Sequence, residues 1–402
     1  MRRFACKMII LYAERLIPHP SSLRGRNHCS RLPVSAQSMG LSVGIVGLPN
    51  VGKSTIFNAL TAAGAQSANY PFCTIEPNVG IVPVADRRLT KLAELAESKQ
   101  IVFTDLKVVD IAGLVRGASK GEGLGNQFLA NIRETDAILH VVRCFDDPNV
   151  VHVEGSVDPQ RDIEVIETEL LLADLDAITK KYDRVGRLTR VGQKEYATQA
   201  EALEKAKNAV DAGTPLRAVD FTDDEREALR ELNLITMKPV LFVANVSEND
   251  LGQETPALAK VRSIAAEKRG EVVVICGELE AQISQLPAAE RDDFLKEMGL
   301  DEPGLNVLIR AAYKLLDLET FFTAGPKEAR AWTIHRGARA PQAAGEIHTD
   351  FERGFIRAET IAYDDYIGCG SEQAAKAAGK MRSEGKDYVV QDGDVILFRF
   401  NV

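Results

Sequence analysis

The hydrophobic and polar positions along the chain fall into two patterns: short apolar runs, and longer stretches in which apolar residues recur every three or four positions. The first pattern predicts strands, at residues 42–46, 79–83, 102–111, 137–145, 239–245 and 271–276. The second predicts helices between them, including residues 55–60, 86–98 and 256–268. Strands and helices that alternate in this way are typical of an α/β domain with a mostly parallel sheet.

One long insertion separates two of these strands. From residue 158 to 234 the sequence is charged and helical, with Ile163, Ile166 and Leu170 on one face and Leu203 on another. This pattern predicts two antiparallel helices that form an arm. We expect its apolar seams to be the arm's own core rather than a groove for a partner.

The pattern changes again at about residue 319. Short strands are predicted at residues 331–334, 355–358, 389–390 and 395–400, and the turn signal Q-D-G-D precedes the last of them. These features predict a small α+β domain at the carboxyl end.

The chain has 402 residues, enough for two or three domains. We assign residues 39–157 and 235–318 to the α/β domain, 158–234 to the arm, 319–402 to the carboxyl-terminal domain and 1–38 to an extension. No apolar run approaches the roughly 20 residues of a membrane helix, so no membrane contact is expected. The six cysteines are scattered without a C-x-x-C pair, which argues against a zinc site and is typical of a reducing cytoplasm.

The formal net charge of −9 means that RNA contact requires a local basic patch. One basic cluster lies at the expected tip of the arm and consists of Lys180, Lys181, Arg184, Arg187 and Arg190. A basic run on a helix is also commonly just a solvated face, so both interpretations stay open.

The first 38 residues carry seven basic side chains against one acid, Glu14. An Arg-rich, acid-poor start is compatible with an organelle transit peptide. We favour a disordered tail or an upstream start codon, since Met39 stands immediately before the first strand.

Residues 47–54, G-L-P-N-V-G-K-S, follow the first strand and precede a helix, which is the context of a phosphate-binding loop. Gly47 and Gly52 permit backbone N–H groups to point at phosphate oxygens. Lys53 is expected to reach the β- and γ-phosphates as a catalytic charge, and Ser54 to hold Mg²⁺. The sequence therefore predicts nucleotide binding.

Two further motifs fit a nucleotide-dependent switch. Thr74 stands in a proline-bounded loop, where its hydroxyl can join Mg²⁺ while the γ-phosphate holds the loop. Asp110 and Gly113 form D-x-x-G at the end of a strand, so that Asp110 is expected to bind Mg²⁺ through water and the Gly113 amide to donate to the γ-phosphate.

The residue after Gly113 is Leu114, where Ras-like switches carry the glutamine that orients water. Another group must then position the attacking water. We take His152 as the candidate catalytic residue, because an imidazole can orient or deprotonate water near neutral pH. The alternative is a loop histidine without a role.

The base-recognition motif departs from the N-K-x-D of related G domains. Asn245 begins N-V-S-E at the carboxyl end of a strand, and Glu248 stands where guanine-binding proteins have aspartate. The longer side chain spoils the bidentate pair to guanine, so we expect guanine to lose its advantage.

Taken together, five motifs resemble the YchF / Obg-like ATPase family over residues 39–402: GLPNVGKST, NYPFCTIEPN, DIAGLV, NVSE and QDGDVILFRFNV. The resemblance implies a Ras-like P-loop G domain of Obg type, a coiled-coil arm and a carboxyl-terminal TGS domain of β-grasp type. It also implies ATP hydrolysis in preference to GTP, and association with the ribosome, with the large subunit as the expected contact.

The same resemblance assigns individual residues. It implies that Ser54 and Thr74 bind the metal and that the run Asn50, Val51, Gly52, Lys53, Ser54 and Thr55 binds phosphate. Val246, Cys276 and Gly277 join Asn245 and Glu248 as expected nucleotide contacts. Asn50 also occupies the position of an asparagine that helps to hold K⁺ in several phosphate-loop proteins, so K⁺ is expected as a second cofactor beside Mg²⁺.

We therefore expect a cytoplasmic, Mg²⁺-dependent ATPase that acts as a conformational switch on ribosomes. Two alternatives remain: a GTP-specific ribosome-assembly factor, and a nucleotide-binding scaffold that does not hydrolyse its ligand.

Overall fold

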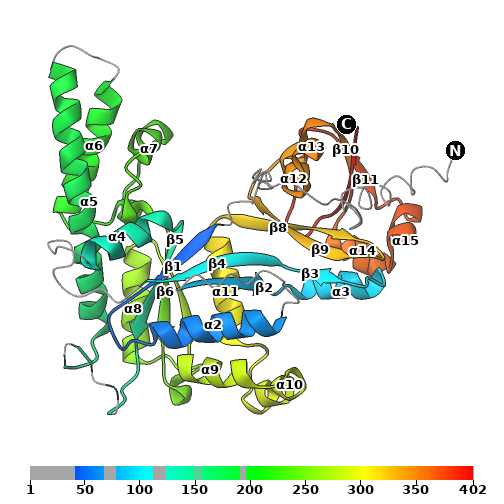
Figure 1. Ribbon diagram of the computed structural model, residues 1–402, viewed down its shortest axis with the longest axis horizontal. Coiled ribbons are helices and arrows are strands. Elements are labelled where there is room, and N and C mark those ends of the chain that lie inside the picture. The colour runs from blue at the N-terminus through cyan, green and yellow to red at the C-terminus, as the bar shows by residue number, and fades with distance from the viewer. Residues whose placement is uncertain are drawn as a thin grey trace, which may run out of the picture. The chain divides into compact units, whose positions relative to one another are not determined.

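The computed structural model describes residues 41–67, 78–111, 124–148, 150, 152–153, 155–190 and 196–401. Figure 1 shows how their helices and strands are arranged. The predictions for residues 1–38, Thr74, Gly113 and Leu114 lie outside these ranges. None of the helices in the described ranges is long and apolar enough to cross a bilayer.

The first sheet carries the phosphate-binding loop at the carboxyl end of one of its central strands. Its order is β2 (Val79–Val84), β4 (Thr104–Asp110), β1 (Ser42–Val46), β5 (Ala137–Arg143), β6 (Val240–Asn245) and β7 (Glu271–Ile275). All neighbours pair in parallel except β2 and β4. The central strands β1, β5 and β6 are buried along their whole length, which explains their continuous apolar runs.

Four helices pack on this sheet and extend the same core: α2 (Lys53–Ser67), α4 (Leu124–Glu134), α8 (Pro256–Glu267) and α11 (Gly304–Leu315). Helices α9 (Gly277–Gln285) and α10 (Ala288–Glu297) share a smaller apolar cluster that includes Leu279, Ile283 and Leu295. The side chain of Thr255 caps α8 by accepting from Leu258 N at 3.2 Å, and Pro256 follows at the first helical position. In Figure 1, α2 lies alongside α9, and these two helices are in contact.

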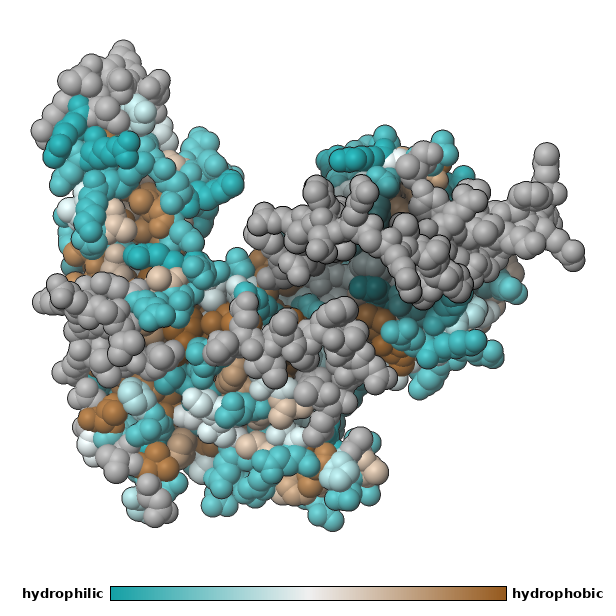
Figure 2. All heavy atoms as spheres, in the orientation of Figure 1, coloured by the Kyte–Doolittle hydropathy of each residue, from teal (hydrophilic) through white to brown (hydrophobic). Residues whose placement is uncertain are grey.

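The inserted segment contains α5 (Pro159–Arg190), α6 (Ala197–Asp211) and α7 (Asp223–Arg230). Because only residues 191–196 separate α5 from α6 and the two helices pack together, they run antiparallel. Their seam has a core of its own that includes Ile178, Leu203 and Val210. The visible face of α5 and α6 in Figure 2 is mostly hydrophilic.

The base of the arm is held by buried polar contacts. The carboxylate of Asp174 on α5 is fully buried and accepts from Ile235 N at 2.9 Å and from Thr236 N and Oγ1 at 2.7 Å. These donors belong to the short turn η3 (Ile235–Met237), which leads into β6. One carboxylate therefore joins the arm to the strand that carries the base-recognition motif.

A second sheet occupies the carboxyl-terminal part. Its order is β11 (Arg382–Glu384), β10 (Phe355–Ile361), β12 (Val395–Phe400), β8 (Leu318–Ala324), β9 (Ala329–His335) and β3 (Ile101–Val102). Helices α12 (Ala340–Ile347), α13 (Thr349–Arg353), α14 (Tyr363–Cys369) and α15 (Glu372–Ala377) lie in the same region. The predicted turn at its end is present, since Gln391 N donates to Asp394 Oδ2 at 3.0 Å and Gly393 has a φ of 91°.

Several details differ from the sequence-based predictions. Strands β8 and β11 were not predicted, and the strand predicted at residues 389–390 is wrong, because Val389 forms only an isolated bridge with Arg339. Ile163, Ile166 and Leu170 of α5 were expected in the arm's own core, yet they belong to the core of the first sheet. Residues 86–102 were predicted within the α/β domain, yet α3 (Arg87–Leu95) buries Leu89 and Leu92 in the core of the second sheet, and β3 extends that sheet.

Candidate nucleotide site

The loop between β1 and α2 has a backbone path that requires glycine. Gly47 and Gly52 have φ angles of 156° and 98°. A Cβ on Gly47 would stand 2.6 Å from the carbonyl oxygen of Val141, and one on Gly52 would stand 2.3 Å from Asn245 Nδ2. Since α2 begins directly after this loop, its helix N-terminus and the loop together form a site that attracts phosphate.

Lys53 is the first residue of α2 and turns back over the loop. Its Nζ donates to the carbonyl oxygen of Leu48 at 2.9 Å, and the side chain is buried. Burial lowers the pKa of Lys53, and the nearby carboxylate of Asp110 opposes this effect. A desolvated ammonium group over the loop is well placed to bind a phosphate oxygen.

Oxygen atoms suited to Mg²⁺ converge beside this lysine. Ser54 Oγ donates to Asp110 Oδ2 at a long 3.4 Å, and Asp110 Oδ1 is buried without a hydrogen-bond partner in the described part of the chain. Burial raises the pKa of Asp110, while the Lys53 charge and the Ser54 hydroxyl lower it. A hydroxyl and an unsatisfied carboxylate oxygen fit the hard oxygen ligands that Mg²⁺ prefers.

Asn245 connects the base-recognition motif to the phosphate-binding loop. Its Nδ2 donates to Val51 O at 3.0 Å, and its Oδ1 accepts from Gly277 N at 2.9 Å. The side chain is buried, so its hydrogen bond to Val51 stabilises the position of the loop. The sequence predicted a nucleotide contact here, and the structure adds a positioning contact that the sequence did not reveal, because 194 positions separate the two residues.

The other predicted base-site residues follow β6 and β7. Val246 is buried and donates its N–H to Ile275 O at 2.9 Å, whereas Glu248 is exposed at the start of a short turn. Cys276 caps the helix α9, which Gly277 begins. Burial raises the pKa of the Cys276 thiol, with smaller contributions from Glu278 and Glu248, so Glu248 and Cys276 belong to one neighbourhood.

The remaining predicted phosphate contacts are both exposed: Asn50 lies on the loop and Thr55 in the first turn of α2. Asn50 has a φ of 61°, a left-handed conformation that asparagine tolerates better than most residues.

His152 is buried rather than exposed on a surface loop. Its Nε2 lies 2.8 Å from Asp162 Oδ2, and the two side chains are 4% and 3% exposed. Asp162 stands in the first turn of α5 and was not identified from the sequence, where an acid at a helix start is an ordinary dipole partner. The predicted catalytic role of His152 stays a prediction.

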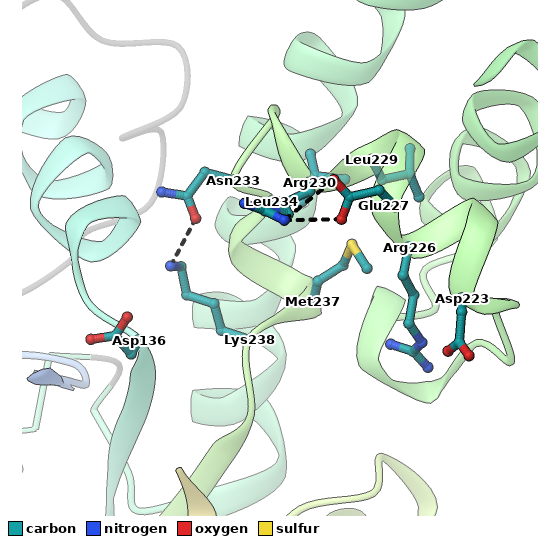
Figure 3. A pocket seen from close by; sticks show the side chains of 10 residues that line it. All are labelled: Asp136, Asp223, Arg226, Glu227, Leu229, Arg230, Asn233, Leu234, Met237 and Lys238. Carbon is teal, nitrogen blue, oxygen red and sulfur yellow. Dashed lines mark hydrogen bonds and ion pairs between the residues drawn. The ribbon is translucent and has the colours of Figure 1, made fainter. Parts of the chain in front are cut away.

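A separate hollow of about 440 Å³ is lined by Asp136, which precedes β5, by α7 and by the segment that leads into β6 (Figure 3). In Figure 3, Lys238 reaches toward Asn233, and Arg230 pairs with Glu227. Its lining combines acids and bases and includes none of the predicted site residues. The nucleotide site is therefore assigned to the phosphate-binding loop and not to this hollow.

Comparison with known families identifies two regions. Residues 42–181 match the family described as "50S ribosome-binding GTPase". Residues 318–401 match YchF-GTPase_C, described as "Protein of unknown function (DUF933)".

Curated relatives match most of the chain. "Ribosome-binding ATPase YchF" of Escherichia coli O157:H7 is 57% identical over 364 residues, which cover 90% of this chain and 100% of the relative. The protein of the same name from Bacillus subtilis (strain 168) is 55% identical, with the same coverage. The solved structure of the Schizosaccharomyces pombe YchF GTPase has a TM-score of 0.81 at 38% identity, covering 90% of this chain and 98% of that one.

These matches agree with the geometry of the site: the glycine-dependent loop, the buried lysine, and the serine and aspartate beside it all fall within the matched regions. The chain belongs to the YchF family of P-loop nucleotide hydrolases.

Proposed function

We propose that this protein is a Mg²⁺-dependent ATPase that binds ribosomes and acts there as a conformational switch. The convergence of Lys53, Ser54 and the unsatisfied Asp110 oxygen at the phosphate-binding loop carries the hydrolase part. The names of the close relatives support ATP and the ribosome. Binding to ribosomes is consistent with the cytoplasmic location that the cysteine pattern indicates.

Ser54 and Asp110, together with Thr74, would hold the Mg²⁺ ion. When bound, Mg²⁺ neutralises charge on the β- and γ-phosphate oxygens. Lys53 adds a fixed positive charge beside these oxygens, and Gly113 would donate its N–H to the γ-phosphate. These groups bind and orient the triphosphate before any bond is broken.

Hydrolysis also needs a group that orients the attacking water. The side chain of Leu114 has no polar atom to orient water, so we assign this task to His152. Its imidazole can hold a water molecule or accept a proton from it.

The preference for ATP rests on Glu248. The carboxylate of the aspartate in the N-K-x-D motif accepts two hydrogen bonds from guanine, and the extra methylene of Glu248 displaces those oxygens. The family descriptions that include the word GTPase favour GTP as the second candidate substrate.

Calorimetric titration with ATP and GTP under Mg²⁺, combined with measured phosphate release, tests the proposal. Wild type should bind ATP more tightly, and Glu248→Asp should move the ratio of the two affinities toward GTP by roughly tenfold, since a lost bidentate pair is worth about 1–3 kcal/mol. Asp250→Glu, a substitution nearby in the same turn, serves as the control. A wild type that prefers GTP supports the GTPase, and one that releases no phosphate supports a scaffold.

We further propose that the arm and the carboxyl-terminal domain face the ribosome and contact RNA on the large subunit, the subunit that the matched family description names. The basic cluster of the arm is partly neutralised: Lys180 pairs with Asp176 at 2.6 Å, and Lys181 pairs with Glu231. Arg184 and Arg187 are then the residues on which RNA contact would depend most.

A further inference from the structure

Strands β2 and β4 form an antiparallel ribbon that has the candidate metal site at its base. Val79 of β2 lies opposite Val109 of β4. Asp110 is the last residue of β4, and its N–H donates to Asn78 O at 2.8 Å. Its side chain carries the buried oxygen, Oδ1, for which the described residues supply no partner. Any bending of the ribbon therefore displaces the carboxylate proposed above as a metal ligand.

The first sheet holds only one half of this ribbon in its hydrogen-bond ladder. Strand β1 pairs with β4 from Lys107 to Asp110, so residues 82–84 and 104–106 extend past the start of β1. Among the described strands of that sheet, these residues have only each other as ladder partners. Their apolar side chains pack on the first core. Because a two-stranded ribbon is only marginally stable alone, a second support stabilises the projecting half.

The chain beyond the projecting half, α3 and β3, is part of the carboxyl-terminal domain. Helix α3 follows β2 and buries Leu89 and Leu92 in the core of the second sheet. Strand β3 pairs with β9, with Ile101 opposite Ala329, and one residue, Phe103, separates β3 from β4. In Figure 1, β2 and β4 lead from the first sheet toward α3 and β3. At about 3.4 Å per residue, the two ends of β4 lie roughly 20 Å apart.

Arg88 joins α3 to the tight turn that precedes β12. Its Nη1 lies 2.6 Å from Asp392 Oδ2, and its Nη2 lies 2.8 Å from Asp86 Oδ2. The guanidinium also stands over the Phe322 ring, 5.3 Å from its centroid. The other oxygen of Asp392, Oδ1, accepts from Thr320 N at 2.9 Å. One carboxylate therefore joins α3 to β8 and fixes the far end of the ribbon in the second domain.

We propose that Arg88 and Asp392 are positioning residues for the metal site, because they fix the far end of the ribbon that carries Asp110. The inference rests on the metal-binding role proposed above for Asp110. Mg²⁺ requires a nearly ideal octahedral arrangement of oxygens, so a carboxylate whose backbone is already fixed loses less conformational freedom when it binds the ion. A ribbon released at its far end bends more, spreads the positions that Asp110 occupies and weakens metal binding.

This arrangement makes the carboxyl-terminal domain a regulator of the nucleotide site. A contact that turns this domain bends the ribbon and changes the metal affinity. By linkage, metal binding favours one position of the domain to the same extent. The phosphate-binding loop itself follows β1 and contacts Asn245, so nucleotide binding without the metal should not depend on the ribbon.

The experiment measures the Kd for ATP by calorimetry in Mg²⁺ and in EDTA. The ratio of the second constant to the first isolates the contribution of the metal. The variants are Arg88→Ala and Asp392→Asn, which retains an oxygen to accept from Thr320 N. Arg339→Ala is the matched control, since Arg339 pairs at 2.7 Å with Asp387 in the same domain and this pair includes no residue of the ribbon or of α3.

We expect Arg88→Ala and Asp392→Asn to lower the ratio by roughly 2- to 30-fold, the range for mutations along a coupling path, and to leave the Kd in EDTA within about twofold of wild type. Arg339→Ala should match wild type in both constants. Asp110→Asn should also lower the ratio. Adding Arg88→Ala to Asp110→Asn should lower it no further, because both changes act through the same carboxylate.

Amide hydrogen exchange of the ATP-bound wild type tests the same coupling without a variant. The reporters join β3 to the second sheet: Lys99 N donates to Pro326 O at 3.2 Å, and Ala329 N donates to Gln100 O at 2.9 Å. Mg²⁺ in place of EDTA should slow exchange at both amides more than in the arm helix α6, which serves as the reference for any general stabilisation.

The outcomes separate this inference from the proposed function. If Mg²⁺ does not tighten ATP binding in wild type, the metal-binding role of Asp110 is refuted, and this inference with it. If Mg²⁺ does so while Arg88→Ala and Asp392→Asn keep the wild-type ratio, only the positioning role is refuted. If neither variant folds, the exchange decides: rates at Lys99 and Ala329 that are the same in Mg²⁺ and in EDTA overturn the inference.

Discussion

Replacing Asn245 with alanine removes two buried hydrogen bonds that join the base-recognition motif to the phosphate-binding loop. The lost contacts are Nδ2 to Val51 O at 3.0 Å and Gly277 N to Oδ1 at 2.9 Å. Each partner left unsatisfied costs about 1–3 kcal/mol, so the free energy of unfolding without nucleotide should fall by roughly 2–6 kcal/mol. Chemical denaturation measures this loss.

The contact to Val51 also predicts a change in phosphate binding. We assume that about half of the lost free energy, roughly 1–3 kcal/mol, stabilised the loop. Triphosphate binding must then supply this free energy to order the loop, so the Kd should rise by roughly 5- to 150-fold. The effect should not depend on the base. We therefore expect ATP, GTP and inorganic tripolyphosphate, which has no base, to lose affinity by similar factors in calorimetric titrations.

Asn208→Ala is the matched control, since Asn208 is exposed on the arm helix α6. It should leave the Kd values unchanged and should not reduce stability, because alanine favours a helix. The reasoning is refuted if Asn245→Ala weakens ATP while tripolyphosphate binds as before, because Asn245 would then act on the base alone.

Four further outcomes are expected. Asp174→Ala should lower the free energy of unfolding by about 3–5 kcal/mol, because three buried donors of Ile235 and Thr236 lose their acceptor, whereas exposed Asp176→Ala should change it little in the same urea titration. Burial lowers the pKa of His140 to about 3, so the unfolded chain, with a histidine pKa near 6.5, binds the proton first as the pH falls. The stability of wild type relative to His140→Gln should then drop by about 2 kcal/mol between pH 7 and pH 5, and a constant difference would contradict this. ATP hydrolysis should be faster in KCl than in NaCl if Asn50 helps to hold K⁺ beside the bridging oxygen, and equal rates would exclude the ion from the reaction. Arg184→Glu with Arg187→Glu should reduce co-sedimentation with ribosomes and its dependence on salt, and unchanged sedimentation would remove the arm from the interface.

The parts of the structure that the sequence predicted are those in which the signal is local. The phosphate-binding loop could be predicted because its glycines, lysine and serine are contiguous and lie between a strand and a helix. The central strands β1, β5 and β6 could be predicted because burial on both faces leaves a continuous apolar run.

The parts that the sequence did not predict depend on contacts between distant positions. Helical spacing predicted a helix at residues 86–98, but not that its Leu89 and Leu92 would be buried in the core of the second sheet. Two adjacent valines at residues 389–390 have a strong preference for strands, yet they lack a neighbouring strand to pair with. The same limit applies to Asn245 and Asp162, whose partners are set by the fold and not by spacing.

The pairing of β3 with β9 also constrains the order in which the protein can fold during synthesis. Ile101 pairs with Ala329, and Ser98 Oγ donates to Gly325 O, a residue 227 positions later. At about 5–20 residues per second, the ribosome takes roughly 10–45 s to supply that partner. Throughout this interval the unpaired edge of β3 and the apolar face of α3 have no surface to cover them, so the nascent chain is open to aggregation or chaperone binding until its last domain is made.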